Sequence, residues 1–108
     1  MNNPTTYTKP NTLGDLLIST HLRINAKLEV STEAIPLGTP LIVVSDDEGY
    51  TASVAPANEA NGILLENCEE TSKVGVLISG EIKASFYKDK PLSNELRTNL
   101  LKNQIVLY

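Results

Sequence analysis

The sequence predicts a mainly β fold, a compact barrel or tulip-shaped domain with one short C-terminal helix and an extended N-terminal arm. Apolar and polar residues alternate over residues 20–30, which is typical of a strand with one buried face. Further short apolar runs are separated by turn-forming residues, and helical spacing is clear near the C-terminus. At 108 residues the chain is expected to form one β-rich domain, residues 20–108, preceded by an arm at residues 1–19.

The first twelve residues are polar and contain no aliphatic side chain after Met1. They include two prolines, four threonines and three asparagines, so they offer too little apolar surface to offset the entropy of ordering. Two interpretations are open: an ordinary loose terminus, or an arm that orders on a partner with Tyr7 as its anchor. Fully extended, such an arm would reach ~40 Å.

The strand at residues 20–30 is the clearest pattern in the chain, because a helix would scatter its apolar residues around the circumference. The residues expected on its buried face are Leu22, Ile24, Ala26, Leu28 and Val30. The segment before it, residues 13–18, fits either a helical turn or a strand.

A hairpin with a polar tip is expected over residues 41–54. Pro36 and Pro40 argue against a helix here, and the apolar run that begins at Leu41 indicates a buried strand. A turn at residues 45–49 then leads into a short return strand.

Three further strands are expected in the second half of the chain, at residues 63–65, 74–78 and 81–87. The last of these alternates, with Ile82, Ala84 and Phe86 on one face. Gly75 and Gly80 predict a close backbone approach or a bend.

The pattern changes to helical spacing over residues 91–103. Ser93 is the expected N-cap, and Asn103 is expected in the left-handed position after the helix. The apolar stripe of this helix consists of Leu96, Leu100 and Leu101. The last five residues are predicted to form a strand.

Composition argues against several classes of protein. The formal net charge is -4 and the basic residues are scattered, which disfavours nucleic-acid and membrane-surface partners. No apolar run approaches the ~20 residues of a spanning helix, and the N-terminus lacks the features of a secretory signal. The single cysteine excludes an internal disulfide, so we expect synthesis in a cytoplasm.

The residues suited to chemistry do not form a recognisable constellation. His21 has no second histidine or cysteine near it in sequence, so a solvated imidazole is expected rather than a base or metal ligand. Cys68 has acidic neighbours, which do not favour a reactive thiolate. The acidic runs at 46–48 and 66–70 lack the spacing of a calcium loop, and the glycines lack phosphate-binding motifs. We therefore expect no enzyme activity, metal or cofactor.

Four segments in order, within residues 36–108, resemble the head decoration (capsid cement) proteins of lambda-like tailed phages. "GTPLIVV" with "YTASV" resembles the first core hairpin of that family, and "NGILLEN" resembles its next strand. "VGVLISGEIKAS" resembles a strand that turns at a glycine, here Gly80. "LSNELRTNLLKNQIVLY" resembles the closing helix and final strand. Each motif is short, so the resemblance depends on the order and spacing of the four motifs together.

The resemblance implies a non-enzymatic virion protein that binds the outer surface of an expanded capsid as a homotrimer at three-fold or quasi-three-fold sites and stabilises it. It also implies that the N-terminal segment adds a strand to the major capsid protein. By position and composition, the residues that match this capsid-binding arm are Pro4, Thr5, Thr6, Tyr7, Thr8, Lys9 and Pro10. The well-patterned strand at residues 20–30 departs from the family and leaves the length of the free arm open.

Two other functions remain open on the sequence. One is the capsid-binding base of a head fibre, and the other is a small non-catalytic ligand-binding or regulatory β-domain. The second would require a concave pocket with converging polar groups.

Overall fold

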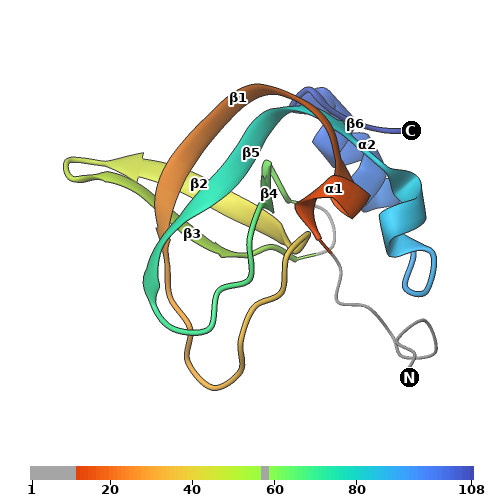
Figure 1. The fold of residues 1–108 in the computed structure, drawn as a ribbon. Helices are drawn as coiled ribbons and strands as arrows, with labels where there is room; N and C mark the ends of the chain where they lie inside the picture. Colours follow the sequence, from red (N-terminus) through yellow and green to blue (C-terminus); the bar gives the residue numbers. More distant parts are fainter. Residues whose placement is uncertain (1–11, 57–58) are drawn as a thin grey trace, which may run out of the picture.

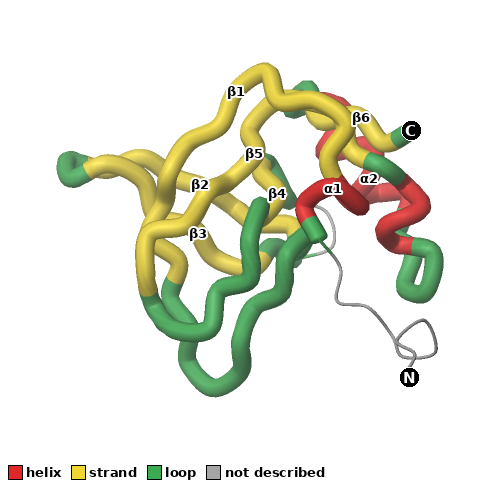
Figure 2. Tube along the Cα trace, viewed as in Figure 1, coloured by secondary structure: helices red, strands yellow, loops and turns green. Residues whose placement is uncertain are grey.

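The computed structural model describes residues 12–56 and 59–108 and confirms a mainly β fold. Figures 1 and 2 show the strands curling around one side of the molecule and the helices gathered at the other. The strands in these ranges are β1 (Leu17–Leu28), β2 (Pro40–Asp46), β3 (Gly49–Val54), β4 (Gly62–Leu64), β5 (Ser72–Ile82) and β6 (Ile105–Leu107). The helices are α1 (Leu13–Leu16), the 3-10 helix η2 (Ala84–Tyr87) and α2 (Asn94–Lys102).

Five of the strands close into a ring. The sheet has the order β1-β3-β2-β4-β5-β6, and β1 also pairs with β5, so the first five strands form a small barrel. The β1–β3 and β5–β6 pairs are parallel, whereas the other pairs are antiparallel. Closure pairs most of the strand edges that an open sheet would present, although the first half of β1 pairs only with β5.

The longest ladder joins β1 to β5, from the Leu17–Ile82 pair to the Leu28–Ser72 pair. Its register shifts between Leu17 and Arg23, where the strands bend over the end of the barrel. Gly80 lies at this bend, and a Cβ there would collide with the carbonyl oxygen of Ser19. The predicted close approach at Gly80 is confirmed.

The β2–β3 hairpin projects from the barrel, as the yellow-green ribbon at the left of Figure 1 shows. Its strands are paired from Leu41–Val54 to Asp46–Gly49, so the turn is tight. Asp46 Oδ1 accepts a hydrogen bond from the backbone N–H of Glu48 at 2.8 Å, and Gly49 has φ 126°. A carboxylate that bonds its own turn and a glycine at positive φ are typical of such hairpin ends.

The interior of the barrel forms one hydrophobic cluster, which we call the barrel cluster. The predicted alternation is confirmed at Ala26 and Leu28, which are fully buried while Lys27 between them is exposed. The buried members are Ala26, Leu28, Leu41, Val43, Ala52, Leu64, Cys68, Val74 and Val76.

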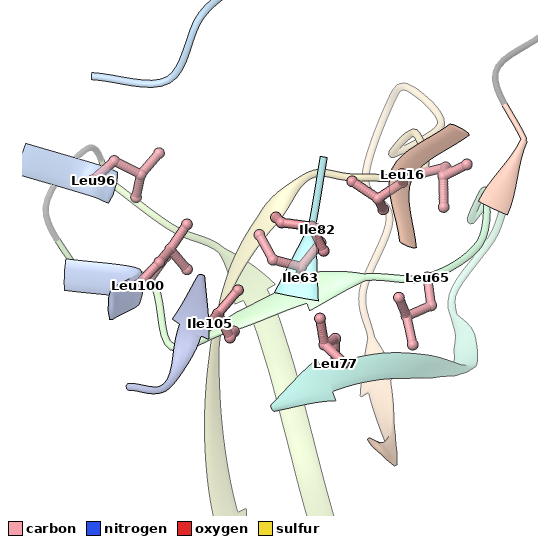
Figure 3. Close-up of a cluster of buried hydrophobic side chains, with 10 residues drawn as sticks. Leu16, Ile63, Leu65, Leu77, Ile82, Leu96, Leu100 and Ile105 are labelled. Atoms are coloured by element: carbon pink, nitrogen blue, oxygen red, sulfur yellow. The ribbon is translucent and has the colours of Figure 1, made fainter. Parts of the chain in front are cut away.

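A second cluster, which we call the helix-side cluster, lies between the outer face of β4 and β5 and the helices. Figure 3 shows its side chains converging from α1, β4, β5, α2 and β6. Its buried members are Leu16, Leu37, Ala60, Ile63, Leu65, Leu77, Ile82, Leu96, Leu100 and Ile105.

Helix α2 begins as predicted and ends differently. Ser93 Oγ accepts a hydrogen bond from the N–H of Leu96 at 3.1 Å, which confirms the N-cap. Gln104 at φ 68°, and not Asn103 at φ -97°, takes the left-handed conformation. Asn103 Nδ2 instead donates to the carbonyl oxygen of Asn99 at 2.9 Å, which holds it in line with the helix. Leu101 was expected in the apolar stripe but is 57% exposed, because it faces away from the cluster.

The predicted strand at residues 81–87 is wrong beyond Ile82, because residues 84–87 form η2. The tertiary structure overrides the alternating pattern here. The N–H of Ala84 donates to the carbonyl oxygen of Tyr108 at 2.7 Å. Phe86 and Tyr87 then pack edge to face, with ring centroids 5.1 Å apart.

The domain also begins earlier than expected. Residues 13–19, assigned from sequence to the arm, form α1 and the start of β1. Leu16 is fully buried in the helix-side cluster, and the carbonyl oxygen of Leu16 accepts from the N–H of Lys83 at 2.7 Å. Burial of this leucine and its backbone bond fix the segment to the domain, so residues 13–19 are part of the domain and not of an extended arm.

Candidate functional site

The predicted capsid-binding residues lie outside the described part of the chain. Pro4 to Pro10 fall within residues 1–11, so their role stays a prediction. The first described residue, Thr12, is tied to the domain by hydrogen bonds from its N–H and hydroxyl to Asp15 Oδ2, at 3.0 and 3.1 Å. Thr12 therefore belongs with the domain.

The residues weighed for chemistry lie far apart in the fold. His21 is exposed on β1, and Asp46 to Glu48 are exposed at the hairpin tip. Cys68 is 1% exposed and belongs to the barrel cluster, and its thiol donates a hydrogen bond to the carbonyl oxygen of Glu70 at 3.2 Å. Among the described residues, no three histidine, cysteine or acidic side chains lie close enough together to hold a metal. The same ranges contain no helix long and apolar enough to cross a membrane.

One apolar groove lies at the mouth of the barrel, where the hairpin diverges from β1. We call it the barrel-mouth groove, and its volume is about 270 Å³. Leu22, predicted on the buried face of β1, is 51% exposed here, and Tyr50 opposite is 45% exposed. The groove is lined by Leu22, Ile24, Val43, Ser45, Tyr50, Asn61, Ile78 and Asn103.

The Asn61 side chain, in the wall of this groove, is bonded to the backbone of β2. Its Oδ1 accepts from the N–H of Val43 at 2.8 Å, and its Nδ2 donates to the carbonyl oxygen of Val43 at 3.1 Å. The side chain thus extends the β2–β4 pairing by one step at Asn61, directly before the short strand β4 begins at Gly62. Both ends of the Asn61 amide are therefore engaged by Val43, and the other polar side chains that line the groove are Ser45, Tyr50 and Asn103.

The first half of β1 is an available strand edge. In the described ranges β1 pairs with β5 from Leu17 onward, but its pairing with β3 is confined to Lys27 and Leu28. Ile18 and Leu22 on this stretch are 46% and 51% exposed. A strand with one unpaired side and exposed apolar residues is suited to strand addition by another chain.

A larger groove lies beside η2, and we call it the proline–aromatic groove. Its volume is about 550 Å³. Gly38, at φ 88°, allows the ring of Phe86 to lie against the backbone, since a Cβ there would stand 2.5 Å from Phe86 Cε2. The apolar residues that line the groove include Pro36, Leu37, Pro40, Phe86, Pro91 and Leu92.

Tyr87 fixes one wall of this groove. Its hydroxyl donates to the carbonyl oxygen of Gly38 at 2.7 Å. Burial of the ring raises the pKa of the Tyr87 hydroxyl well above its ordinary value of 10.0, so the group stays protonated and keeps donating. The wall therefore persists across the physiological pH range.

Both grooves are lined by residues whose positions were not predicted from the sequence. Leu22 was expected to be buried, and the groove beside η2 depends on a turn that was expected to be a strand. A sequence signal for the second groove existed in the prolines at 36, 40 and 91 together with Phe86 and Tyr87. Prolines and aromatic residues outside regular strands are common in interaction surfaces.

Comparison with known proteins gives no relative. No protein-family model, no curated protein and no solved structure matches the chain. The candidate surfaces are therefore interpreted from their own geometry.

Proposed function

We propose that this protein is a structural virion protein that decorates the outer surface of an expanded phage capsid and stabilises the shell. In this proposal it acts as a trimer at three-fold or quasi-three-fold sites. Its N-terminal arm, with Pro4 to Pro10 at the centre, adds to the major capsid protein. The protein is made in the host cytoplasm and has neither a catalytic role nor a cofactor.

The order of the structural elements carries the proposal. The four segments that resemble the decoration family occupy the β2–β3 hairpin, β4, β5 with its bend at Gly80, and α2 followed by β6. These elements contribute to the two adjoining clusters of one domain. The resemblance therefore follows one continuous structural unit and is not spread over unrelated pieces.

Two further features support a contact function. The free edge of β1 and the exposed apolar residues around it provide surface for a protein partner. Strand addition by a polar arm uses backbone hydrogen bonds, so threonine, asparagine and proline are adequate residues for it. Three arms on one trimer would act together through their effective concentration.

The test is co-sedimentation of the purified protein with expanded cognate shells that lack it. We expect saturable binding of the intact protein and loss of binding when residues 1–11 are deleted. The deletion stops before Thr12 because this residue bonds to Asp15 and belongs to the domain.

Two controls make the result specific. Replacement of residues 4–10 by a glycine–serine segment of equal length tests whether the arm acts through its sequence or only as a spacer. A circular dichroism spectrum and an unfolding curve like those of the intact protein show that the deletion leaves the domain folded. Full binding by the deletion variant would contradict the role of the arm, and no binding by the intact protein would contradict the proposal.

A small-ligand function is the second candidate, favoured by the barrel-mouth groove. The groove is concave and apolar, but its volume of about 270 Å³ lies below the usual range for ligand sites, and Asn61 is already bonded to Val43. Saturable micromolar binding of a small apolar molecule, lost in Leu22→Ser and accompanied by no shell binding, would favour this function.

A further inference from the structure

Two successive segments of the chain carry opposite net charge. Residues 12–82 contain eleven acidic and three basic side chains, whereas residues 83–108 contain five basic and two acidic ones. The most concentrated acidic group is Asp46, Asp47 and Glu48, all exposed at the hairpin tip. The basic segment builds η2, α2 and one wall of the proline–aromatic groove.

The proline–aromatic groove is an apolar surface with two lysines and one aspartate at its rim. Lys90 lines it and Lys88 lies at the end of η2, both exposed. Asp89 also lines the groove and offsets part of this charge. A partner that places an apolar side chain in the groove and a carboxylate at its rim would satisfy both features.

The outer face of the hairpin tip offers both an apolar side chain and a carboxylate. Val44 and Asp46 are two residues apart in β2 and therefore point to the same side of the hairpin. Val44 is 54% exposed. Gly49 lies across from Asp46, and a Cβ built there meets nothing within 4 Å, so another surface can approach the tip closely.

The hairpin tip lies at the left of Figure 1, whereas η2, which supplies Phe86 and Tyr87 to the groove, lies at the right, so the tip does not reach these residues of the same chain. We propose that the outer face of the hairpin tip of one copy binds the proline–aromatic groove of a second copy, head to tail. This inference names the surfaces that join neighbouring copies. It rests on the proposed function for its biological setting.

The geometry of this contact has two consequences. A head-to-tail contact uses different surfaces on its two partners, so it closes into a ring or extends as a chain. A trimer would be the smallest ring in keeping with three-fold sites. Because the charges involved are exposed, association weakens as ionic strength rises.

The first experiment measures the mass of the free protein by sedimentation velocity, without shells, in low and high salt. We expect self-association that rises with concentration and falls in high salt. Asp46→Lys with Asp47→Lys, or Lys88→Glu with Lys90→Glu, should each lower the association constant about tenfold or more. The combination of the two pairs should restore association, because the opposite charges are exchanged.

The matched control reverses two acidic residues elsewhere. Glu69→Lys with Glu70→Lys makes the same change in net charge in an exposed part of the β4–β5 connection, and should leave association unchanged. A protein that stays monomeric at high concentration in low salt would overturn the inference. So would equal loss of association in this control, since net charge and not the contact would then govern the result.

The second experiment tests the pairing of the two surfaces by disulfide formation. Asp47→Cys and Lys90→Cys are made in separate chains, and native Cys68 is buried and does not compete. We expect a crosslink on mixing the two variants and little in either alone. Equal crosslinking in one variant alone would indicate a symmetric contact and overturn the head-to-tail arrangement. Neither outcome depends on shell binding, so failure here is distinct from failure of the proposed function.

Discussion

The two hydrophobic clusters of the domain differ in the side chains that fill them. The barrel cluster has alanine or valine at five of its nine buried positions, whereas the helix-side cluster has leucine or isoleucine at nine of ten. A ring of five strands encloses a narrow space that small side chains fill. The helix-side cluster fills the wider gap between a sheet and helices, so its packing depends on large side chains and should be the more sensitive to truncation.

The largest expected effect is at Leu100 in the helix-side cluster. This residue is fully buried on α2, and Leu100→Ala should lower the free energy of unfolding by about 3 kcal/mol, because it removes buried apolar surface and leaves a cavity. Urea denaturation followed by circular dichroism measures the change.

Leu101→Ala is the matched control, since the same chemical change is made one residue later at a side chain that is 57% exposed. Its expected effect is under about 0.5 kcal/mol. Equal costs at the two positions would show that α2 does not pack as described.

The packing of the barrel cluster can be tested by adding a side-chain atom, whereas that of the helix-side cluster is tested by truncation. A Cβ at Gly62 would stand 2.8 Å from Val76 Cγ1 and 3.2 Å from Val43 Cγ2. Gly62→Ala should therefore destabilise the domain by about 2 kcal/mol. Gly14→Ala is the control, because its nearest neighbour, Thr12 Oγ1, is 3.8 Å away. A stabilised Gly62→Ala variant would mean that the barrel interior has spare room.

The N-cap of α2 tests how far the helix-side cluster depends on local helix stability. Ser93→Ala removes the acceptor for the N–H of Leu96 and should cost about 1 kcal/mol. Thr98→Ala on the exposed face of the same helix should be close to neutral. If thermal melting shows the same stability for Ser93→Ala and the intact protein, the cluster alone holds the helix.

Tyr87→Phe should have an effect at neutral pH no larger than that of Ser93→Ala, and a distinctive effect at high pH. Tyr87→Phe leaves the carbonyl oxygen of Gly38 without this donor and should cost about 1 kcal/mol. Burial raises the pKa of Tyr87 in the folded protein, so above about pH 10 the unfolded chain loses this proton while the folded chain keeps it.

The intact protein should therefore lose stability as the pH rises above about 10, and Tyr87→Phe should lack the part of this loss that Tyr87 causes. The difference in stability between the two proteins should narrow between about pH 9 and 11 in urea denaturation. A constant difference over this range would show that the hydroxyl is not buried. Tyr108, whose pKa is raised by its hydrogen bond to Glu81 and the charge of that residue, is present in both proteins and cancels.

Individual strands of the barrel could be predicted from the sequence, because the patterns that specify them are local. Alternation from Ala26 to Leu28, the turn residues before Gly49 and the apolar run from Leu41 follow directly from strand geometry. The ring closure did not follow, because the parallel pairing of β1 with β3 joins segments whose register no local pattern specifies.

The helix-side cluster and the grooves were predicted less well because they depend on tertiary contacts. Leu16, assigned to the arm, becomes a core residue through packing against distant elements. The alternation through Phe86 suggested a strand, but the chain turns where Ala84 bonds to Tyr108. The exposure of Leu22 follows from divergence of the hairpin, which is a property of the assembled sheet and not of the strand.

The double hydrogen bond of Asn61 bears on the chemical ageing of the protein. Asparagine followed by glycine, as in Asn61–Gly62, is the sequence most prone to deamidation, because the glycine N–H can attack the side-chain amide in a flexible chain. Here the amide is bonded to Val43 and Gly62 is already in β4, so folding holds the two groups apart. Deamidated in an unfolded chain, residue 61 would become a carboxylate that cannot donate to the Val43 carbonyl. Folding should therefore slow the deamidation of Asn61. A carboxylate at this position would indicate that the chain had earlier been unfolded.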